Sequence, residues 1–286
     1  MKFSLAATSA IVLTAFASLA RADEYADAMK EWCQGLSVTA PADNAVASAG
    51  QQQTITVTRQ PDQRTKTITG LDLYSVSQSG DAKYVQNVWS GNYTLNQEAS
   101  IQDQIPSNAT AGLYYYRVWV TNQINGMHGP DCLETSHTFK VTTGVHQDAN
   151  GINYYTESLD DSKIYHPDHF RGCFGLTVEY PKEGQTFKDG EHIRLGVNRD
   201  SSSQTETLKK VDLYKKTGDD EATFVETVWQ GSERFVNAFT LKDHLKLDQA
   251  DETSSYYYVL DVTSNKADDS CTFASKEFKI APASSA

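Results

Sequence analysis

The chain has 286 residues, 39% of them apolar, and a formal net charge of −12 at pH 7. That length is too great for one small core and fits two domains of ordinary size. Because the surface is acidic and no basic stripe interrupts it, the composition argues against nucleic acid and against an anionic membrane as partners.

Residues 1–22 have the pattern of a secretory signal peptide. Lys2 gives a charged start, an apolar stretch runs from about Leu5 to Leu19, and Ala20-Arg21-Ala22 forms a small-residue cleavage site. The stretch is shorter than the roughly 20 strongly apolar residues that cross a bilayer. We expect cleavage after Ala22 and a mature charge of 23 − 37 = −14. The C-terminus shows no hydrophobic anchor tail, so we expect a secreted chain without a membrane span.

The remainder of the chain contains two copies of one pattern. The matching segments, at offsets of 139 to 142 residues, are Cys33-Gln34-Gly35-Leu36 with Cys173-Phe174-Gly175-Leu176, Asp72-Leu73-Tyr74 with Asp212-Leu213-Tyr214, Val88-Trp89-Ser90-Gly91 with Val228-Trp229-Gln230-Gly231, Tyr114-Tyr115-Tyr116 with Tyr256-Tyr257-Tyr258, and Phe139-Lys140-Val141 with Phe278-Lys279-Ile280. Such self-similarity indicates a duplicated structural unit.

Each copy holds short runs rich in β-branched and aromatic residues, separated by Gly, Pro, Asn and Asp clusters. In the first copy the expected strands are Leu36–Thr39, Thr54–Arg59, Gly70–Val76, Lys83–Trp89, Leu113–Thr121 and Ser136–Thr142. In the second they are Leu176–Tyr180, His192–Asn198, Leu208–Lys215, Thr223–Trp229, Ser255–Thr263 and Ser275–Ile280. This pattern predicts an all-β chain with two tandem antiparallel β-sandwich domains of immunoglobulin or fibronectin type III character.

The expected boundaries follow from the repeat. They are a signal peptide over 1–22, an N-terminal segment over 23–32, a first domain over 33–143, a linker over 144–172, a second domain over 173–281 and a tail over 282–286. The linker is acidic and polar, and we expect it to pack partly on the second domain.

Strand alternation assigns one face of each Tyr-rich strand to the core. In the first copy the predicted core positions are Tyr114, Tyr116, Val118 and Val120. In the second copy they are Tyr256, Tyr258, Leu260 and Val262.

The four cysteines occupy equivalent places in the two copies, 99 and 98 residues apart. In a secreted chain this equivalence favours the disulfides Cys33–Cys132 and Cys173–Cys271 over the two other pairings. The spacing contains no C-x2-C pair and therefore does not indicate a metal site.

Two kinds of residue are candidates for function. Asn92 and Asn108 stand in N-x-S/T sequons and are predicted N-glycosylation sites on loops. Tyr115 and Trp119 lie on the strand face opposite the core and are candidates for stacking on a ligand. The alternative is that both pack against a loop or the other domain.

The sequence gives little support for a metal site or for catalysis. His166, Asp168 and His169 offer metal-binding groups, but without a third fixed ligand they fit a solvated loop, and we expect no metal or cofactor. The chain shows no nucleophile elbow, metalloprotease helix or phosphate loop, so we expect no catalytic residues and no enzyme. Carboxylates that meet only in the fold would leave a hydrolase open as a third reading.

Several segments together resemble a known module. They are Leu36–Pro41, Thr54–Val57, Leu71–Tyr74, Gly112–Val118 and Phe139–Val141, with Leu176–Pro181, His192–Leu195 and Val211–Tyr214 in the second copy. They are similar to the N-terminal module of fungal Ser/Thr-rich, glycolipid-anchored cell-wall proteins, a family that includes yeast proteins required for β-1,6-glucan assembly. The chain departs from that family by its doubled module, its cysteine pairs and the absence of a Ser/Thr-rich stalk.

The resemblance implies a non-enzymatic fungal protein, extracellular or associated with the cell wall, that organises the wall or binds its polysaccharide. The alternative is a secreted module that binds an extracellular protein through loops or edge strands.

Overall fold

The computed structural model describes residues 27–43, 45–147, 153–155, 166–200, 203–218, 221–235, 238–244, 253–266 and 270–282. The predicted signal peptide, residues 1–22, lies outside the described residues. No described helix is long and apolar enough to cross a membrane.

The described chain is built almost entirely of strands. Those of the first domain are β1 (Leu36–Ala40), β2 (Val46–Ser48), β3 (Gln52–Arg59), β4 (Thr65–Val76), β5 (Ala82–Leu95), β6 (Glu98–Gln104), β7 (Gly112–Ile124), β8 (Met127–His128), β9 (Cys132–Thr135) and β10 (Phe139–Thr142). Those of the second are β13 (Leu176–Tyr180), β14 (Thr186–Lys188), β15 (His192–Arg199), β16 (Thr205–Thr217), β17 (Thr223–Arg234), β18 (Ala238–His244), β19 (Ser254–Ser264), β20 (Ser270–Ala274) and β21 (Lys279–Ala281). Between them lie β11 (Val145–Gln147), β12 (Asn153–Tyr155) and the helical turn α2 (Pro167–Phe170).

The first domain is a sandwich of two sheets. One has the strand order β1-β3-β6, and the other has the order β2-β10-β7-β4-β5, with β8 and β9 also paired to β7. The sheets are antiparallel except at one edge, where β2 runs parallel to β10. The apolar side chains of both inner faces form one buried cluster.

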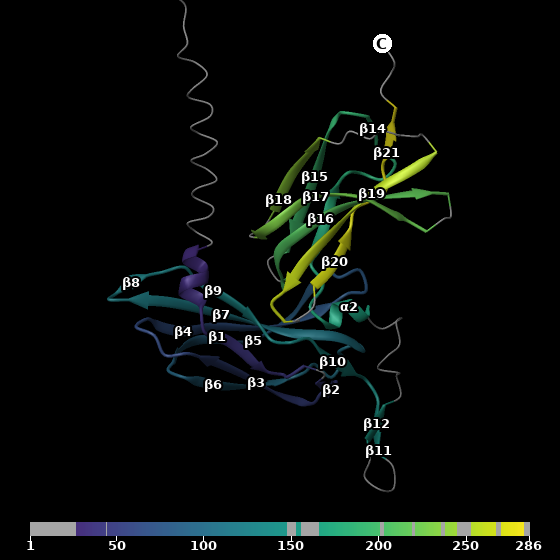
Figure 1. Cartoon of the computed structure of the whole chain (residues 1–286). Helices are drawn as coiled ribbons and strands as arrows, with labels where there is room; N and C mark the ends of the chain where they lie inside the picture. The colour runs from purple at the N-terminus through teal and green to yellow at the C-terminus, as the bar shows by residue number, and fades with distance from the viewer. Residues whose placement is uncertain are drawn as a thin grey trace, which may run out of the picture.

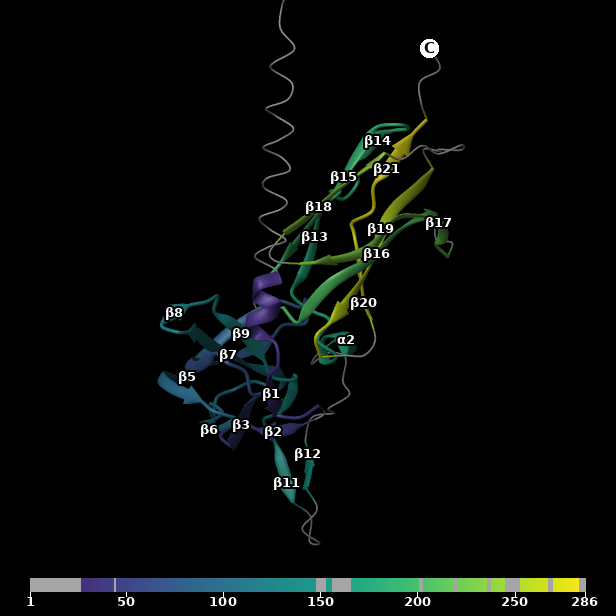
Figure 2. The same cartoon turned by 60° about the vertical axis from the view of Figure 1, so that its left-hand side comes forward.

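The second domain repeats this order as β13-β15-β18 packed against β17-β16-β19-β20, and β14 runs parallel to β21 as β2 does to β10. The two groups of strands are separate bodies that meet close to α2 (Figures 1 and 2). The prediction of an all-β chain with immunoglobulin- or fibronectin-like sandwiches is confirmed.

Both Tyr-rich strands turn the predicted faces inward. Tyr114, Tyr116, Val118 and Val120 on β7 are buried, as are Tyr256, Tyr258, Leu260 and Val262 on β19. In each domain one tyrosine hydroxyl crosses the core to a buried aspartate of the facing sheet. The Tyr116 hydroxyl donates to Asp103 Oδ2 at 2.9 Å, and the Tyr258 hydroxyl donates to Asp243 Oδ2 at 2.8 Å. Burial raises the pKa of both carboxyl groups.

The buried aspartate explains why β6 was not predicted, whereas β18 was not predicted although its Phe239 and Leu241 alternate with polar residues. In β6 the inward positions include Ala99 and Asp103, and the remaining residues are mostly polar and exposed. A strand whose core residue is an acid shows no clear alternation of apolar and polar side chains.

The last strand of each copy begins later than expected and is preceded by a short strand, β9 or β20, that was not predicted. Between β9 and β10 the hydroxyl of Ser136 accepts a hydrogen bond from the Tyr116 amide at 2.9 Å. Ser275 does the same for the Tyr258 amide at 2.9 Å between β20 and β21. The second cysteine of each pair lies in the additional strand, β9 or β20, that precedes the last strand of its domain.

The repeated Val-Trp-x-Gly segment has a packing role. Trp89 and Trp229 are half-buried against the two cores. A Cβ atom added to Gly91 or Gly231 would lie 2.6 or 2.7 Å from the ring of that tryptophan, so the glycine leaves room for the indole.

We predict that Tyr116→Phe destabilises the protein by about 1–3 kcal/mol, because it leaves the Asp103 carboxyl buried without its main donor. Tyr258→Phe should cause a similar loss in the second domain. Urea unfolding measures both, with Tyr93→Phe at an exposed tyrosine as the control. Equal stability of all three variants would contradict the prediction.

Candidate functional site

Two disulfides close the described domains. Cys33 bonds to Cys132 with a Cα–Cα distance of 5.6 Å, and Cys173 bonds to Cys271 with a Cα–Cα distance of 5.3 Å. This is the pairing that the repeat predicted. Each bond joins the segment before the first strand of a domain, β1 or β13, to a strand of the opposite sheet, β9 or β20. The second bond therefore also holds the start of the second domain.

Phe174, the residue after Cys173, is inserted into the first domain. Its side chain is 1% exposed and is clustered with Tyr74, Val76, Leu113 and Tyr115, all of the first domain. The ring centroids of Phe174 and Tyr115 are 5.3 Å apart. Tyr115 is 0% exposed, so the proposal that it stacks on a ligand is wrong. It does lie on the face opposite the core, but the second domain covers it.

Hydrogen bonds surround this apolar contact. The Gly175 amide donates to the Gly80 carbonyl at 2.9 Å, and Gln204 Nε2 donates to the Ser136 carbonyl at 2.8 Å. The Thr138 hydroxyl donates to the Phe170 carbonyl at 2.7 Å. We call these contacts, with Phe174, the domain junction. Residues 166–172 of the expected linker therefore pack on the first domain as well as the second.

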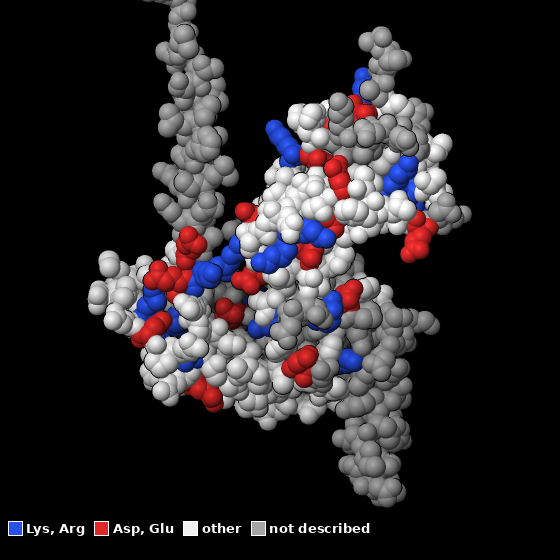
Figure 3. All heavy atoms as spheres, viewed as in Figure 1, with Lys and Arg blue, Asp and Glu red and all other residues white. Residues whose placement is uncertain are grey.

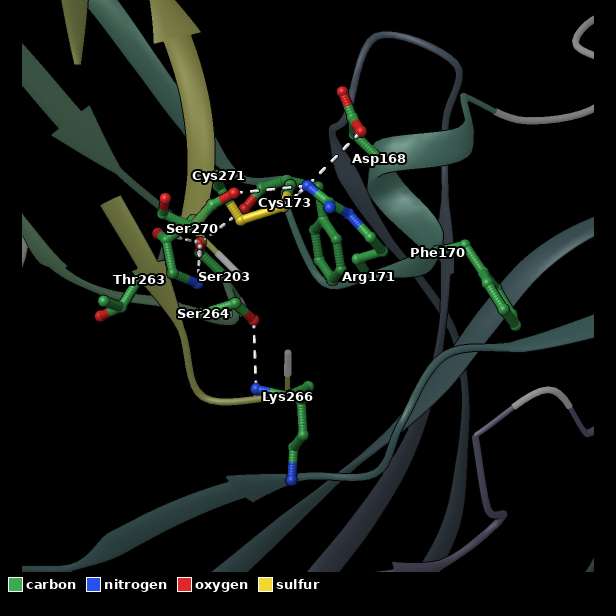
Figure 4. The surroundings of a disulfide bond; sticks show 12 residues. Asp168, Phe170, Arg171, Cys173, Ser203, Thr263, Ser264, Lys266, Ser270 and Cys271 are labelled. Atoms are coloured by element: carbon green, nitrogen blue, oxygen red, sulfur yellow. Dashed lines mark hydrogen bonds and ion pairs between the residues drawn. A yellow bond between two sulfur atoms is a disulfide. The ribbon is translucent and has the colours of Figure 1, made fainter. Parts of the chain in front are cut away.

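The segment before Phe174 is held by the second disulfide and its neighbours (Figure 4). Arg171 Nη2 donates to the Ser270 carbonyl at 3.3 Å and lies 3.7 Å from Asp168 Oδ1. Gly175 has φ +74°, and a Cβ there would lie 2.8 Å from Ser203 Cβ, so this turn requires glycine.

Charged groups of both signs also meet between the domains (Figure 3). Burial raises the pKa of Glu134, on β9, to about 7, although Lys266 and Arg234 of the second domain act in the opposite direction. Burial lowers the pKa of Lys266, and Glu134 partly offsets this. Because the desolvation of the Glu134 carboxyl group outweighs the attraction of Lys266 and Arg234, the neutral acid is favoured up to about pH 7.

A cavity of about 160 Å³ borders the junction, lined among others by Ser79, His166, His169 and Thr272. Pockets for small molecules usually measure roughly 300–1,000 Å³. The cavity is therefore too small for an ordinary organic ligand. Its single carboxylate, Asp168, provides no facing acid for hydrolytic chemistry.

The linker histidines do not form a metal site. His166 Nδ1 accepts a hydrogen bond from the Asp168 amide at 3.3 Å, while His169 is 9% exposed and turned toward Gly80. Within the described ranges no group of three or more His, Cys, Asp and Glu side chains is placed to hold a metal.

Trp119 keeps the exposure that a stacking site needs. Its side chain is 39% exposed on the outer face of β7, and its Nε1 donates to Asp72 Oδ2 at 3.0 Å. The Arg117 guanidinium lies between two rings, 4.2 Å from the Tyr74 centroid and 4.8 Å from the Trp119 centroid. A Cβ at Gly70 would lie 3.2 Å from Trp119 Cδ1, so the indole rests close to the β4 backbone.

This arrangement is absent from the second domain, where Val259 and Asp261 replace Arg117 and Trp119. There Asp212 forms an ion pair with Lys210, with 2.6 Å between Asp212 Oδ2 and Lys210 Nζ. The fixed indole is thus a property of the first domain alone.

The two sequons are both at exposed positions of the first domain. Asn92 lies in β5, not in a loop as expected, and Asn108 lies in the turn between β6 and β7. Their glycosylation stays a prediction.

Comparisons with known proteins add little to this geometry. No protein-family model and no curated protein matches the chain. A structure of the fibronectin(III)-like modules of CbhA from Clostridium thermocellum aligns at 12% identity over 87% of this chain and 95% of that chain, with a TM-score of 0.24. At that TM-score the likeness carries no argument, and the fold rests on the strand order described above.

We predict that Phe174→Ala destabilises the chain by roughly 3–5 kcal/mol, as expected when a buried aromatic ring is removed. Urea unfolding measures the loss, and hydrogen exchange at the Gly175 amide should become faster. Phe224→Ala, at a ring that is 55% exposed, is the matched control and should change stability by less than about 1 kcal/mol. Equal losses in the two variants would contradict the role assigned to Phe174.

A second prediction concerns pH. Because the folded-state pKa of Glu134 is raised from 4.5 to about 7, its contribution to stability is fully present below about pH 4.5 and is lost as the pH rises to about 7. The stability difference between the wild type and Glu134→Gln should therefore fall over that range, by at most about 3 kcal/mol.

Burial also lowers the pKa of His137 and His169, and this makes the stability of the folded chain rise with pH. Both histidines are retained in Glu134→Gln, so their effect cancels in the difference between the two proteins. Urea unfolding at a series of pH values gives the difference directly. A difference that rises with pH, or stays constant, would refute the burial of Glu134.

Proposed function

We propose that this chain is a secreted, non-enzymatic binding protein of a fungal cell wall or its surroundings, and that Trp119 contacts a wall polysaccharide. The observation that carries the proposal is the fixed, half-exposed indole of Trp119, held by Asp72 and Arg117. A flat aromatic ring with a set orientation is suited to pack against a sugar ring and loses little conformational entropy on binding.

Other features agree with this proposal. Two disulfides fit an oxidising compartment outside the cytosol. The carboxylates that lie within the two cores, Asp103 and Asp243, are in separate domains and each is bonded to a tyrosine, so these two do not form the carboxylate pair of a hydrolase.

The binding test uses the secreted full chain on insoluble β-glucan, chitin and chitosan at moderate salt. We expect retention on at least one polymer, and a loss of affinity of about ten-fold or more in Trp119→Ala. Tyr180→Ala, at an exposed ring of similar accessibility in the second domain, is the matched control and should bind as the wild type does.

No retention on any of the three polymers would refute polysaccharide binding. Retention that Trp119→Ala and Tyr180→Ala reduce equally would refute the assignment of the site. N-terminal sequencing of the secreted chain tests secretion itself, and Asp23 is the expected first residue.

A second candidate function, binding of an extracellular protein, is favoured by a different observation. The second domain carries three aromatic side chains, Tyr214, Phe224 and Tyr257, at the position equivalent to the surface of the first domain on which Phe174 packs.

A further inference from the structure

The two domains carry the same aromatic arrangement at the same place in the sheet. In the first domain, Tyr74 on β4 stacks on Tyr115 of β7 at 5.6 Å and meets Tyr84 of β5 edge-on at 5.7 Å. We call these three residues the first seat. It is the surface against which Phe174 packs.

In the second domain, Tyr214 on β16 stacks on Tyr257 of β19 at 5.7 Å and meets Phe224 of β17 edge-on at 5.8 Å. We call these residues the second seat. The interplanar angles also agree, at 26° and 80° in the first seat and 19° and 77° in the second. Duplication has therefore preserved the geometry, although Phe replaces Tyr at one position.

The seats differ in what covers them at two of their three positions. Tyr115 and Tyr74 are buried under the second domain, whereas their counterparts Tyr257 and Tyr214 are only half-buried. The third ring is exposed in both seats, at 58% for Tyr84 and 55% for Phe224. The first seat is covered by the domain that follows it. If a further module packed on the second domain in the same way, it would cover the second seat.

The border of the second seat is polar. Val76 and Leu113, which enclose Phe174 in the first domain, are replaced by Lys216 and Ser255. Lys216 Nζ lies 3.5 Å from Glu277 Oε1, and the Ser255 hydroxyl donates to Glu277 Oε2 at 2.7 Å. An aromatic centre with a polar border is typical of interfaces whose partners also exist apart.

We infer that the second seat docks a β-sandwich module of a separate protein, which presents an aromatic residue followed by glycine just before its first strand, as Phe174-Gly175 does. The first seat of the same chain holds such a segment, and the second seat repeats the three rings of the first in the same geometry. The inference goes beyond polysaccharide binding, since it concerns another domain and another class of partner.

A second copy of this chain is not the expected partner. Gly35 has φ +75°, matching the +74° of Gly175, so the first domain presents the same turn. The side chain before it, however, is the exposed and polar Gln34, which offers no aromatic ring to the seat.

The test titrates the 13C-labelled full chain with a synthetic peptide of residues 168–177 that carries Cys173→Ser, followed by NMR of the aromatic rings. At peptide concentrations on the order of 1 mM we expect saturable shifts of Tyr214, Phe224 and Tyr257. A peptide that also carries Phe174→Ala should bind about ten-fold more weakly, and Tyr257→Ala in the protein should abolish the shifts.

A gain-of-function variant tests the same seat without a peptide. Gln34→Phe should form head-to-tail oligomers in analytical ultracentrifugation that the wild type does not form, and adding Tyr257→Ala to Gln34→Phe should abolish them. The inference is overturned if neither the peptide nor Gln34→Phe engages the seat, or if both peptides bind equally. It is also overturned if a β-1,3-glucan hexasaccharide shifts these rings and the peptide does not.

Discussion

The packing of Phe174 on Tyr115 fixes how the two domains are joined. Without it, two sandwiches on a polar linker would be expected to move independently, as domains with small interfaces usually do. With it, the ring of Phe174 is buried in the neighbouring domain. Hydrogen bonds from the Gly175 amide and the Gln204 side chain to backbone carbonyls of the first domain surround the ring. The disulfide from Cys173 to Cys271 holds the residue next to Phe174 against the second domain.

This contact also separates residues that serve folding from residues left for function. Tyr115 and Trp119 occupy the same face of one strand, four residues apart, yet one is covered by the second domain and the other is exposed. Features found in both copies, such as the Tyr–Asp bonds through the cores and the Trp-x-Gly packing, are explained by stability of the module. The features found in one copy alone are the fixed indole of Trp119 in the first and the uncovered seat in the second.

The duplicated pattern and the strand alternation were sufficient to predict the fold class, the cysteine pairing and the inward faces of β7 and β19. The strand β6 was not predicted, since one of its core positions holds Asp103, whose burial depends on the hydroxyl of Tyr116 on another strand. The strand β18 was also not predicted, although Phe239 and Leu241 alternate with polar residues in it. It also could not reveal the junction. Phe174 differs from Gln34 at the equivalent place, and that difference was the one available signal that the second domain begins with a buried aromatic ring.

The packing of Phe174 on the first domain requires that the two domains behave as one rigid body in solution. Residual dipolar couplings of the wild-type backbone amides measure this directly, because each domain reports its own alignment in a weakly ordered medium. If Phe174 locks the junction, the couplings of both domains fit one alignment tensor with the domain orientation seen here. Two tensors of clearly different magnitude would show independent motion and would contradict the account.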